Sequence, residues 1–279
     1  MTRRVVYFHA NQPSFSIDTM DYTERECSQI LFKDPDTLFS TYAFHGRSKK
    51  LMVIPDLSTD IILSLGKNQS QIQLYGPVNS CRISSIPEDR DIFGLRFKPG
   101  TSALFLGYAE KDLINVENEF VMPEFTKRVM ENICSYDDFR TKTILVNRLF
   151  RDFVKERYHL SYMCFDTSLQ NLSNAILLKI ISDHGTKRVA QLAEEMGYSK
   201  RYLNRVFQQH FGMSIKECSR IVRFQAVLSL LQKNDKHPSV IAGELGYYDQ
   251  SHFIHEIKEL SGYTPKKLAE KIRRVTIEI

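Results

Sequence analysis

The chain has 279 residues, of which 42% are hydrophobic and 25% charged, and its formal net charge is +5. This length allows two hydrophobic cores, so two domains are expected. No apolar run approaches the roughly 20 residues that a bilayer-spanning helix requires, and the short apolar stretch at the N-terminus does not fit a signal peptide. We therefore expect a cytoplasmic protein that does not contact membranes.

Cysteine and histidine spacing bears on disulfide, metal and catalytic chemistry. An odd number of separated cysteines without a C-x-x-C pair argues against a disulfide framework or a cysteine zinc site, so all five are expected to be small buried side chains. The N-terminal part lacks a His-x-His pair, and no Ser-His-Asp, phosphate-loop or nucleophilic cysteine motif occurs. We expect no metal, no cofactor and no enzymatic activity. The cysteines are Cys27, Cys81, Cys134, Cys164 and Cys218.

The first predicted elements are β-strands. Between residues 37 and 97, hydrophobic side chains recur with a period near two, and turn signals at residues 54–56, 65–68, 75–77 and 98–100 separate the runs. An antiparallel barrel or sandwich is therefore expected. In the last strand, Arg96 and Lys98 share one face and Phe97 takes the other. Arg96 and Lys98 are expected at the surface, as are Asp56 and Asp60, rather than in an effector cavity.

After Glu124 the hydrophobic period changes to three or four residues, which predicts that residues 125–160 are helical. Packing of this helix on its own domain is favoured over a seam between two subunits. The apolar stripe consists of Ile144, Leu145, Leu149, Phe153 and Val154.

The positive charge is concentrated in the C-terminal part. Residues 1–159 contain 21 Lys+Arg and 21 Asp+Glu, whereas residues 160–279 contain 17 and 12. A basic half suits a polyanionic partner, although surface lysines and arginines are usually only solvated.

An internal repeat dominates residues 169–271, which are expected to be entirely helical. The sequence of residues 193–198, AEEMGY, recurs at residues 242–247 as AGELGY, and after one extra residue the match resumes at an offset of 50. Such a repeat indicates one supersecondary unit used twice.

Each repeat predicts two helices joined by a tight turn. A small alanine allows the helices to approach, a glycine four residues later ends the first helix, and Ser199 or Asp249 caps the second. The second helices are expected at residues 200–210 and 250–260. Their buried side chains would be Leu203 and Phe207 in the first unit and Phe253 and Ile257 in the second.

The other face of each second helix is expected to be free. It is either a DNA-reading surface or only a solvated charged face, and the duplication favours the first. In the first unit this face is rich in groups that hydrogen-bond base edges and phosphates. A long helix over residues 214–232 can place the two units roughly 34 Å apart, as successive major grooves require. The face consists of Lys200, Arg201, Asn204, Arg205 and Gln208.

These residues resemble the AraC/XylS family of bacterial transcription regulators over roughly a hundred residues, with the same order and spacing. The matching positions include Val189–Ala193, Gly197–Ser199, Leu203, Arg205, Phe207, Phe211–Ser214, Arg223, Leu230–Leu231, Ile241–Ala242, Leu245–Tyr247, Asp249–Phe253 and Gly262–Pro265.

The resemblance implies which residues face DNA. In the first unit they are Arg201, Asn204 and Arg205. In the second unit, His255 stands where an arginine is common and Ile257 where a phenylalanine is common, so a weaker or phosphate-directed contact is expected there. The second face would consist of Gln250, Ser251, His252 and His255.

The N-terminal region resembles a small-barrel domain that occurs fused to this DNA-binding module. The matching features are Ile54–Asp56, Asp60–Ile62, Tyr75–Pro77, Phe93–Gly100 and Ala103–Leu106, while Leu57 stands where a glycine is common. The resemblance implies an effector or dimerisation domain and identifies no ligand.

The expected fold class is α+β. A cupin-like antiparallel β-barrel domain occupies residues 1–124, a helical linker residues 125–165, and an all-α domain with two helix-turn-helix units residues 166–279. The expected partners are double-stranded DNA and RNA polymerase. The binding of a small-molecule effector and the formation of a homodimer are left open. In the alternative, the N-terminal domain is a protein-interaction module without a ligand.

Overall fold

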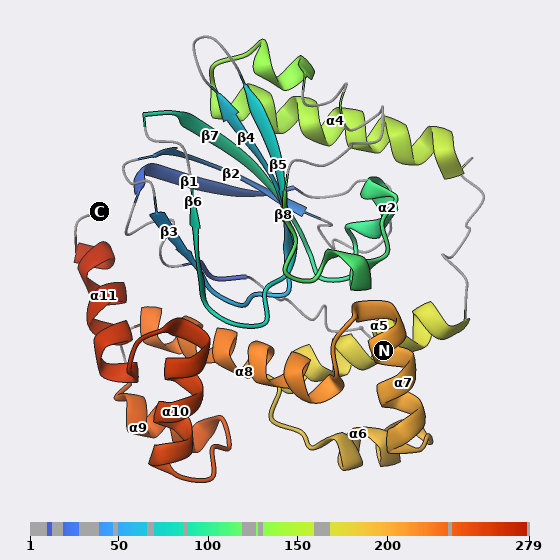
Figure 1. The fold of residues 1–279 in the computed structure, drawn as a ribbon, viewed down its shortest axis with the longest axis vertical. Helices are drawn as coiled ribbons and strands as arrows, with labels where there is room; N and C mark the ends of the chain where they lie inside the picture. Colours follow the sequence, from blue (N-terminus) through green and yellow to red (C-terminus); the bar gives the residue numbers. More distant parts are fainter. Residues whose placement is uncertain are drawn as a thin grey trace.

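The computed structural model describes residues 10–12, 19–27, 39–46, 50–65, 70–85, 89–118, 127, 131–158, 168–233 and 236–277. The strands gather in an N-terminal domain, and the helices from residue 168 onwards form a second body beneath it (Figure 1). Among the described residues, no helix is both long and apolar enough to cross a membrane.

The N-terminal domain contains a six-stranded and a two-stranded antiparallel sheet. The larger has the order β1-β2-β7-β4-β5-β8, and the smaller pairs β3 with β6. The strands are β1 (Thr19–Cys27), β2 (Phe39–Gly46), β3 (Lys50–Val53), β4 (Thr59–Leu65), β5 (Gln71–Tyr75), β6 (Arg82–Ser85), β7 (Asp91–Phe97) and β8 (Glu117–Asn118).

The antiparallel fold is confirmed, but the expected barrel is not. Among the described strands, no ladder joins the two sheets or closes the larger one. Both faces of the larger sheet are nevertheless buried, because alternate side chains of β4 enter different cores. Ile61 and Leu63 pack in one core, and Ile62 packs in the other with Leu51 of β3.

The helical prediction for residues 125–160 was wrong at residues 135–138, which are not helical. It is confirmed for α4 (Phe139–Tyr158), which lies across the larger sheet (Figure 1). Its Val146 and Phe150 are buried in the sheet core, which confirms packing on its own domain. The predicted stripe was correct only in part, because Leu149 packs against this core whereas Ile144 is 55% exposed. Two short helices, α2 (Ala103–Leu106) and η1 (Glu110–Leu113), follow β7.

The expectation that Arg96, Asp56 and Asp60 lie at the surface was wrong. Arg96 is buried and donates from Nε and Nη2 to the carboxylate of Asp60, at 3.1 and 3.2 Å. Its Nε also lies 3.9 Å from Oδ2 of Asp56. The three residues therefore hold one another inside the domain, where a buried charge needs a partner.

One guanidinium faces two buried carboxylates in this network, so they are not fully neutralised. Burial raises the pKa of Asp60 from 3.8 to about 6, although Arg96 acts to lower it. Because the pKa is higher in the folded state, the stability from protonation is fully present below the unfolded value and is lost as pH rises through about 6.

We expect the wild type to lose stability relative to Asp60→Asn as pH rises from about 4.5 to 7. Urea denaturation of both proteins at each pH measures the difference. If the wild type instead gained stability relative to Asp60→Asn as pH rises, the prediction would be contradicted, since an ion pair with a lowered carboxyl pKa behaves in that way.

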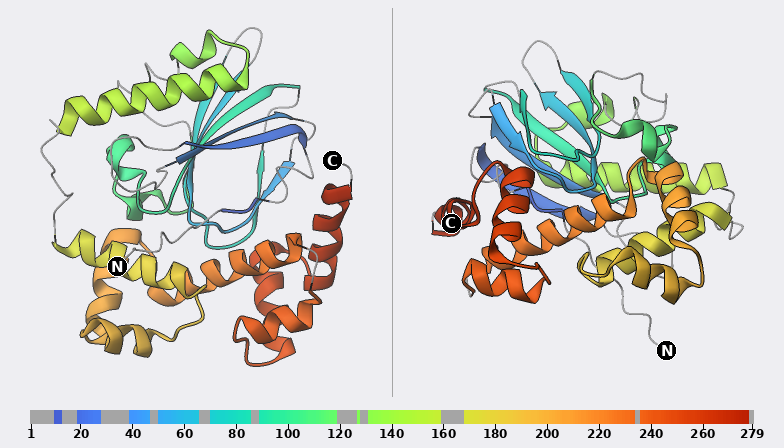
Figure 2. Two further views of the ribbon diagram at one scale, coloured as in Figure 1. Left: turned by 180° about the vertical axis from the view of Figure 1, so that it is seen from behind. Right: turned by 60° about the horizontal axis from the view of Figure 1, so that its bottom comes forward.

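The second body consists of seven helices among the described residues. They are α5 (Ser168–Ser182), α6 (Val189–Met196), α7 (Lys200–Phe211), α8 (Ile215–Gln232), α9 (Pro238–Glu244), α10 (Gln250–Ser261) and α11 (Pro265–Ile277). The long helix α8 runs beneath the sheets, with α5–α7 at one end and α9–α11 at the other (Figures 1 and 2).

The cysteine expectation holds only in part. Cys218 is buried, as expected, but Cys81 is half-buried and Cys134 is exposed. The structure does not describe Cys164 or the side chain of Cys27.

Candidate nucleic-acid interface

The first unit has the predicted helix-turn-helix geometry. Helix α6 ends at Gly197, whose φ of 74° is the left-handed conformation that glycine adopts readily. Two residues later, Oγ of Ser199 accepts a hydrogen bond from the backbone N–H of Tyr202 and caps α7. Both predicted devices are confirmed, and the turn directs α7 away from α6.

Helix α7 has one buried and one exposed face. Leu203 and Phe207 lie in the core of the first unit, and Val206 is buried on the same face, all with exposures of 0–2%. The opposite face exposes a set of long polar side chains, among which no ion-pair partner is assigned in the described structure. The exposed residues are Lys200, Arg201, Arg205 and Gln208.

Asn204 differs from the other predicted contacts because both ends of its amide are already bonded. Its Nδ2 donates to the carbonyl of Lys200 at 3.1 Å, and its Oδ1 accepts from the backbone N–H of Ile215 at 3.3 Å. The amide thereby ties α7 to the start of α8. It can reach a base only by giving up these bonds.

Tyr198, in the turn before α7, and Tyr202, on α7, lie next to Arg205. The rings of Tyr198 and Tyr202 stack with centroids 5.4 Å apart, and the guanidinium of Arg205 lies 5.3 Å from the Tyr202 ring. A cation over an aromatic face is held in place while its N–H groups stay available. Sequence reasoning missed the tyrosines, because Tyr198 lies in the turn before α7, where the helical i, i+4 spacing does not apply.

The second unit repeats the backbone design. Gly246 follows α9 with a φ of 67°, and Asp249 caps α10 by accepting from the backbone N–H of His252 at 2.7 Å. Phe253 and Ile257 are buried, as expected. All four predicted contacts of α10 are exposed, namely Gln250, Ser251, His252 and His255.

The second unit differs from the first in its charges. Glu256, only 4% exposed, accepts hydrogen bonds from Arg220 at 3.0 Å and from Arg223 at 3.3 Å, and Arg220 also donates to Glu259 at 2.7 Å. Burial acts to lower the pKa of Arg220, but these hydrogen bonds raise it overall. The two carboxylates neutralise much of the positive charge that α8 presents next to α10.

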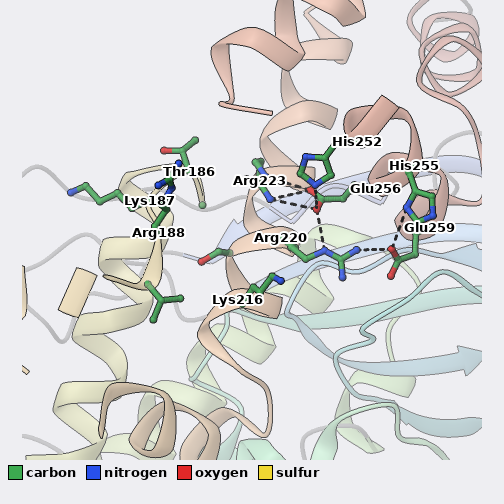
Figure 3. Close-up of a pocket in the computed structure, with 13 residues that line it drawn as sticks. Thr186, Lys187, Arg188, Lys216, Arg220, Arg223, His252, His255, Glu256 and Glu259 are labelled. Atoms are coloured by element: carbon green, nitrogen blue, oxygen red, sulfur yellow. Dashed lines mark hydrogen bonds and ion pairs between the residues drawn. The ribbon is translucent and has the colours of Figure 1, made fainter. Parts of the chain in front are cut away.

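A cleft of about 550 Å³ lies between the two units (Figure 3). Its walls come from the segment before α6, from the exposed side of α8 and from α10, so His252 and His255 line it as well. Five basic side chains against two carboxylates leave it net positive. The charged residues are Lys187, Arg188, Lys216, Arg220, Arg223, Glu256 and Glu259.

Sequence reasoning did not single out Lys187, Arg188 or Lys216. Lys187 contacts Asp183 and Glu195 at 3.0 and 2.7 Å, whereas Arg188 and Lys216 are exposed. The signal that was available is the position of Lys216 on the predicted long helix, one turn before Arg220. No group of three or more potential metal ligands occurs in the part of the chain that the structure describes.

The sequence profile of a helix-turn-helix domain matches residues 192–271, which span α7 to α10 and most of α11. This is the segment that carries the duplicated geometry and the resemblance described above. Residues 192–271 belong to the AraC-type helix-turn-helix family. A second profile, that of a domain of unknown function (DUF6597), matches residues 37–119 of the sheet domain.

Curated relatives of this chain are named transcriptional regulators. An uncharacterized HTH-type transcriptional regulator of Haemophilus influenzae is 25% identical over 129 residues, which are 46% of this chain and 43% of the relative. The HTH-type regulator YtdP of Bacillus subtilis is 26% identical over 147 residues, 51% of this chain and 19% of the relative. The chain thus covers less than half the length of these relatives.

Among solved structures, ToxT from Vibrio cholerae is similar, with 15% identity, a TM-score of 0.45, and coverage of 84% of this chain and 97% of ToxT. At this TM-score the likeness supports no conclusion about a shared ligand.

Proposed function

We propose that the chain is a cytoplasmic, sequence-specific DNA-binding transcriptional regulator. The observation that carries the proposal is the duplicated unit whose first recognition helix, α7, buries Leu203 and Phe207 and exposes Arg201 and Arg205 on the opposite face. Arginines are the side chains that most often read guanine in the major groove, and a helix of this diameter fits that groove.

The spacing of the two units suits one side of a duplex. Helix α8 has 18 residues and is therefore about 27 Å long. With α7 at its N-terminal end and α10 packed beside it through Arg220 and Arg223, α8 is the spacer that would set the roughly 34 Å between successive major grooves. We propose that α7 enters one groove and α10 the next.

The two helices contribute unequally in this proposal. Helix α7 offers arginine and lysine to bases and phosphates, whereas α10 offers amide, hydroxyl and imidazole groups next to two carboxylates. We therefore assign most of the sequence reading to α7. The proposed contacts are Lys200, Arg201, Asn204, Arg205 and Gln208 on α7, and Gln250, Ser251, His252 and His255 on α10.

The positive cleft between the units is placed to hold the phosphate strand that runs from one major groove to the next. Lys216 is its exposed lysine on α8. A phosphate contact releases counterions and carries no sequence information.

Lys216→Ala should weaken binding to specific and random duplexes alike and lower the slope of log affinity against log salt by about 1. Fluorescence-anisotropy titrations at several salt concentrations measure the slope. Lys111→Ala, which replaces an exposed lysine of η1 in the sheet domain, is the control. An unchanged slope in the Lys216 variant would exclude the contact.

We divide the chain into an effector or dimerisation domain (residues 1–124), a helical linker (125–165) and the DNA-binding domain (166–279). A small ligand or self-association would act through the first, and RNA polymerase would be the partner of the DNA-bound protein. A thermal-shift screen tests for the ligand, because binding to the folded state raises the melting temperature. A silent screen would favour a protein-interaction module.

The direct test is a titration of the full chain against the promoter region of its own gene and against random DNA at two salt concentrations. Salt-sensitive binding that prefers the promoter supports the proposal. Equal affinity for both DNAs at each salt concentration would refute sequence-specific regulation.

A further inference from the structure

One loop of the sheet domain reaches both helix-turn-helix cores. It runs from Ile54 to Ser58, between β3 and β4. Ile54 is 1% exposed and packs in the core of the second unit, whereas Leu57 is 5% exposed and packs in the core of the first. Two side chains three residues apart thus belong to the cores of two different units.

The two cores meet on α8. Cys218, Ile221 and Val222 of this helix lie in the core of the first unit, while Phe224 and Val227 lie in that of the second. A single helix does not by itself fix the placement of the two units, because long helices curve gently. The 54–58 loop lies beside the part of α8 where the buried side chains pass from the core of the first unit to that of the second.

A buried glutamine fastens the loop to this junction. Gln225 is 2% exposed, and its Nε2 donates to the carbonyl oxygens of Pro55 and Asn11, at 2.7 and 3.3 Å. Its Oε1 accepts from the backbone N–H of Asn11 at 2.7 Å. Gln12 in turn binds the loop, donating to the carbonyl of Ile54 at 2.7 Å and to Asp56 at 2.8 Å.

The backbone of the 54–58 loop is strained at Leu57. Leu57 has a φ of 63°, in the left-handed region that residues with a Cβ rarely adopt. Strain of this kind persists only where the surroundings hold it. Here the surroundings are the core of the first unit, where Leu57 packs.

Further contacts pack the sheet domain against the first unit. A Cβ on Gly212, the C-cap of α7, would lie 2.8 Å from Cα of Lys111 in η1, and one on Gly100 would lie 3.1 Å from the Phe211 ring. Only about 10 Å³ of free space remains in the interface pocket lined by Leu57, Phe207 and Phe211. The docked surfaces therefore leave little room for relative movement.

We propose that the 54–58 loop is a brace that fixes the relative placement of the two recognition helices, and so sets the half-site spacing that the protein accepts on DNA. The inference rests on the proposed function. Ile54, Leu57 and Gln225 are positioning residues in it, since they act on DNA only through the placement of α7 and α10.

The test starts from duplexes that the full-length wild type selects from a random pool, with one or two base pairs inserted or deleted between the half-sites. One base pair shifts the second half-site by roughly 3.4 Å and a tenth of a turn. We expect the wild type to lose at least about tenfold in affinity, and Leu57→Gly to lose less than about threefold.

Leu57→Gly suits this test because glycine accepts the left-handed backbone and removes only the side chain that enters the first unit. Asp89→Gly is the matched control, because Asp89 also has a positive φ, 52°, but is exposed in the sheet domain. Gln225→Met, which keeps the side-chain volume and removes the hydrogen bonds, is the second variant. A far-ultraviolet melting curve checks that each variant is folded.

Two results of the DNA-binding test would overturn the proposal that the loop is a brace. One is a wild type that binds all spacings equally, and the other is a pair of folded variants that keep the spacing preference of the wild type. Binding of no duplex by the wild type would instead refute the proposed function.

Hydrogen exchange in the absence of DNA tests the brace independently of the proposed function. Amides of residues 220–228 should exchange at least about threefold faster in Leu57→Gly than in Asp89→Gly, because an unbraced junction opens more often. Equal exchange rates in the two variants would overturn it.

Discussion

Replacing Phe207 with alanine should lower the free energy of unfolding of the C-terminal domain by about 3–5 kcal/mol. The side chain is fully buried, and its ring lies 4.7 Å from that of Phe211 between α7 and the helices behind it. Removing it deletes both the transfer free energy and the contacts of the surrounding side chains. Small domains have little more stability than this to lose.

Urea denaturation followed by helix circular dichroism measures this change. Gln208→Ala is the control, because Gln208 is the exposed neighbour on the same helix and its replacement should change the free energy by less than about 0.5 kcal/mol. Equal effects of the two replacements would show that α7 does not pack as described.

The second large effect is expected in DNA binding. Arg205→Ala should weaken binding to the preferred sequence by about 1–3 kcal/mol, the usual discrimination of one good bidentate contact to a base. The guanidinium is exposed and lies over the Tyr202 ring, so its loss leaves no buried group without a partner. The folded state should therefore be almost unchanged.

Competition titrations of this variant against preferred and random duplexes separate base reading from phosphate contact. Selective loss on the preferred sequence supports base reading, and equal loss on both would assign Arg205 to the backbone. Gln209→Ala, which alters an exposed uncharged residue on the same helix, should leave both affinities unchanged.

The local structure of the C-terminal domain was largely predictable. Glycine and capping residues act within a few positions of the chain, so Gly197, Ser199 and Asp249 indicate the turns and helix starts that the structure contains. The duplication strengthened the prediction of two helix-turn-helix units, because two copies of one pattern rarely arise without a common geometry. The buried faces of α7 and α10 followed from the same helical period.

Contacts between distant segments were not predictable. Arg96 was assigned to the surface because strand alternation gives its face but not what covers that face, and the partner Asp60 lies 36 residues away. The ladder of hydrogen bonds, which decides between a closed barrel and separate sheets, is equally non-local. The left-handed Leu57 was visible only as a departure from a glycine, and its role needed the core into which it packs.

The central claim is that one chain reads two successive major grooves, and hydroxyl-radical footprinting of the full-length protein on its preferred duplex tests it most directly. We predict two protected segments about one helical turn apart on one side of the DNA. Within them, Arg205→Ala should weaken protection first at the half-site that α7 occupies. A single protected segment, or uniform protection around the duplex, would contradict the claim.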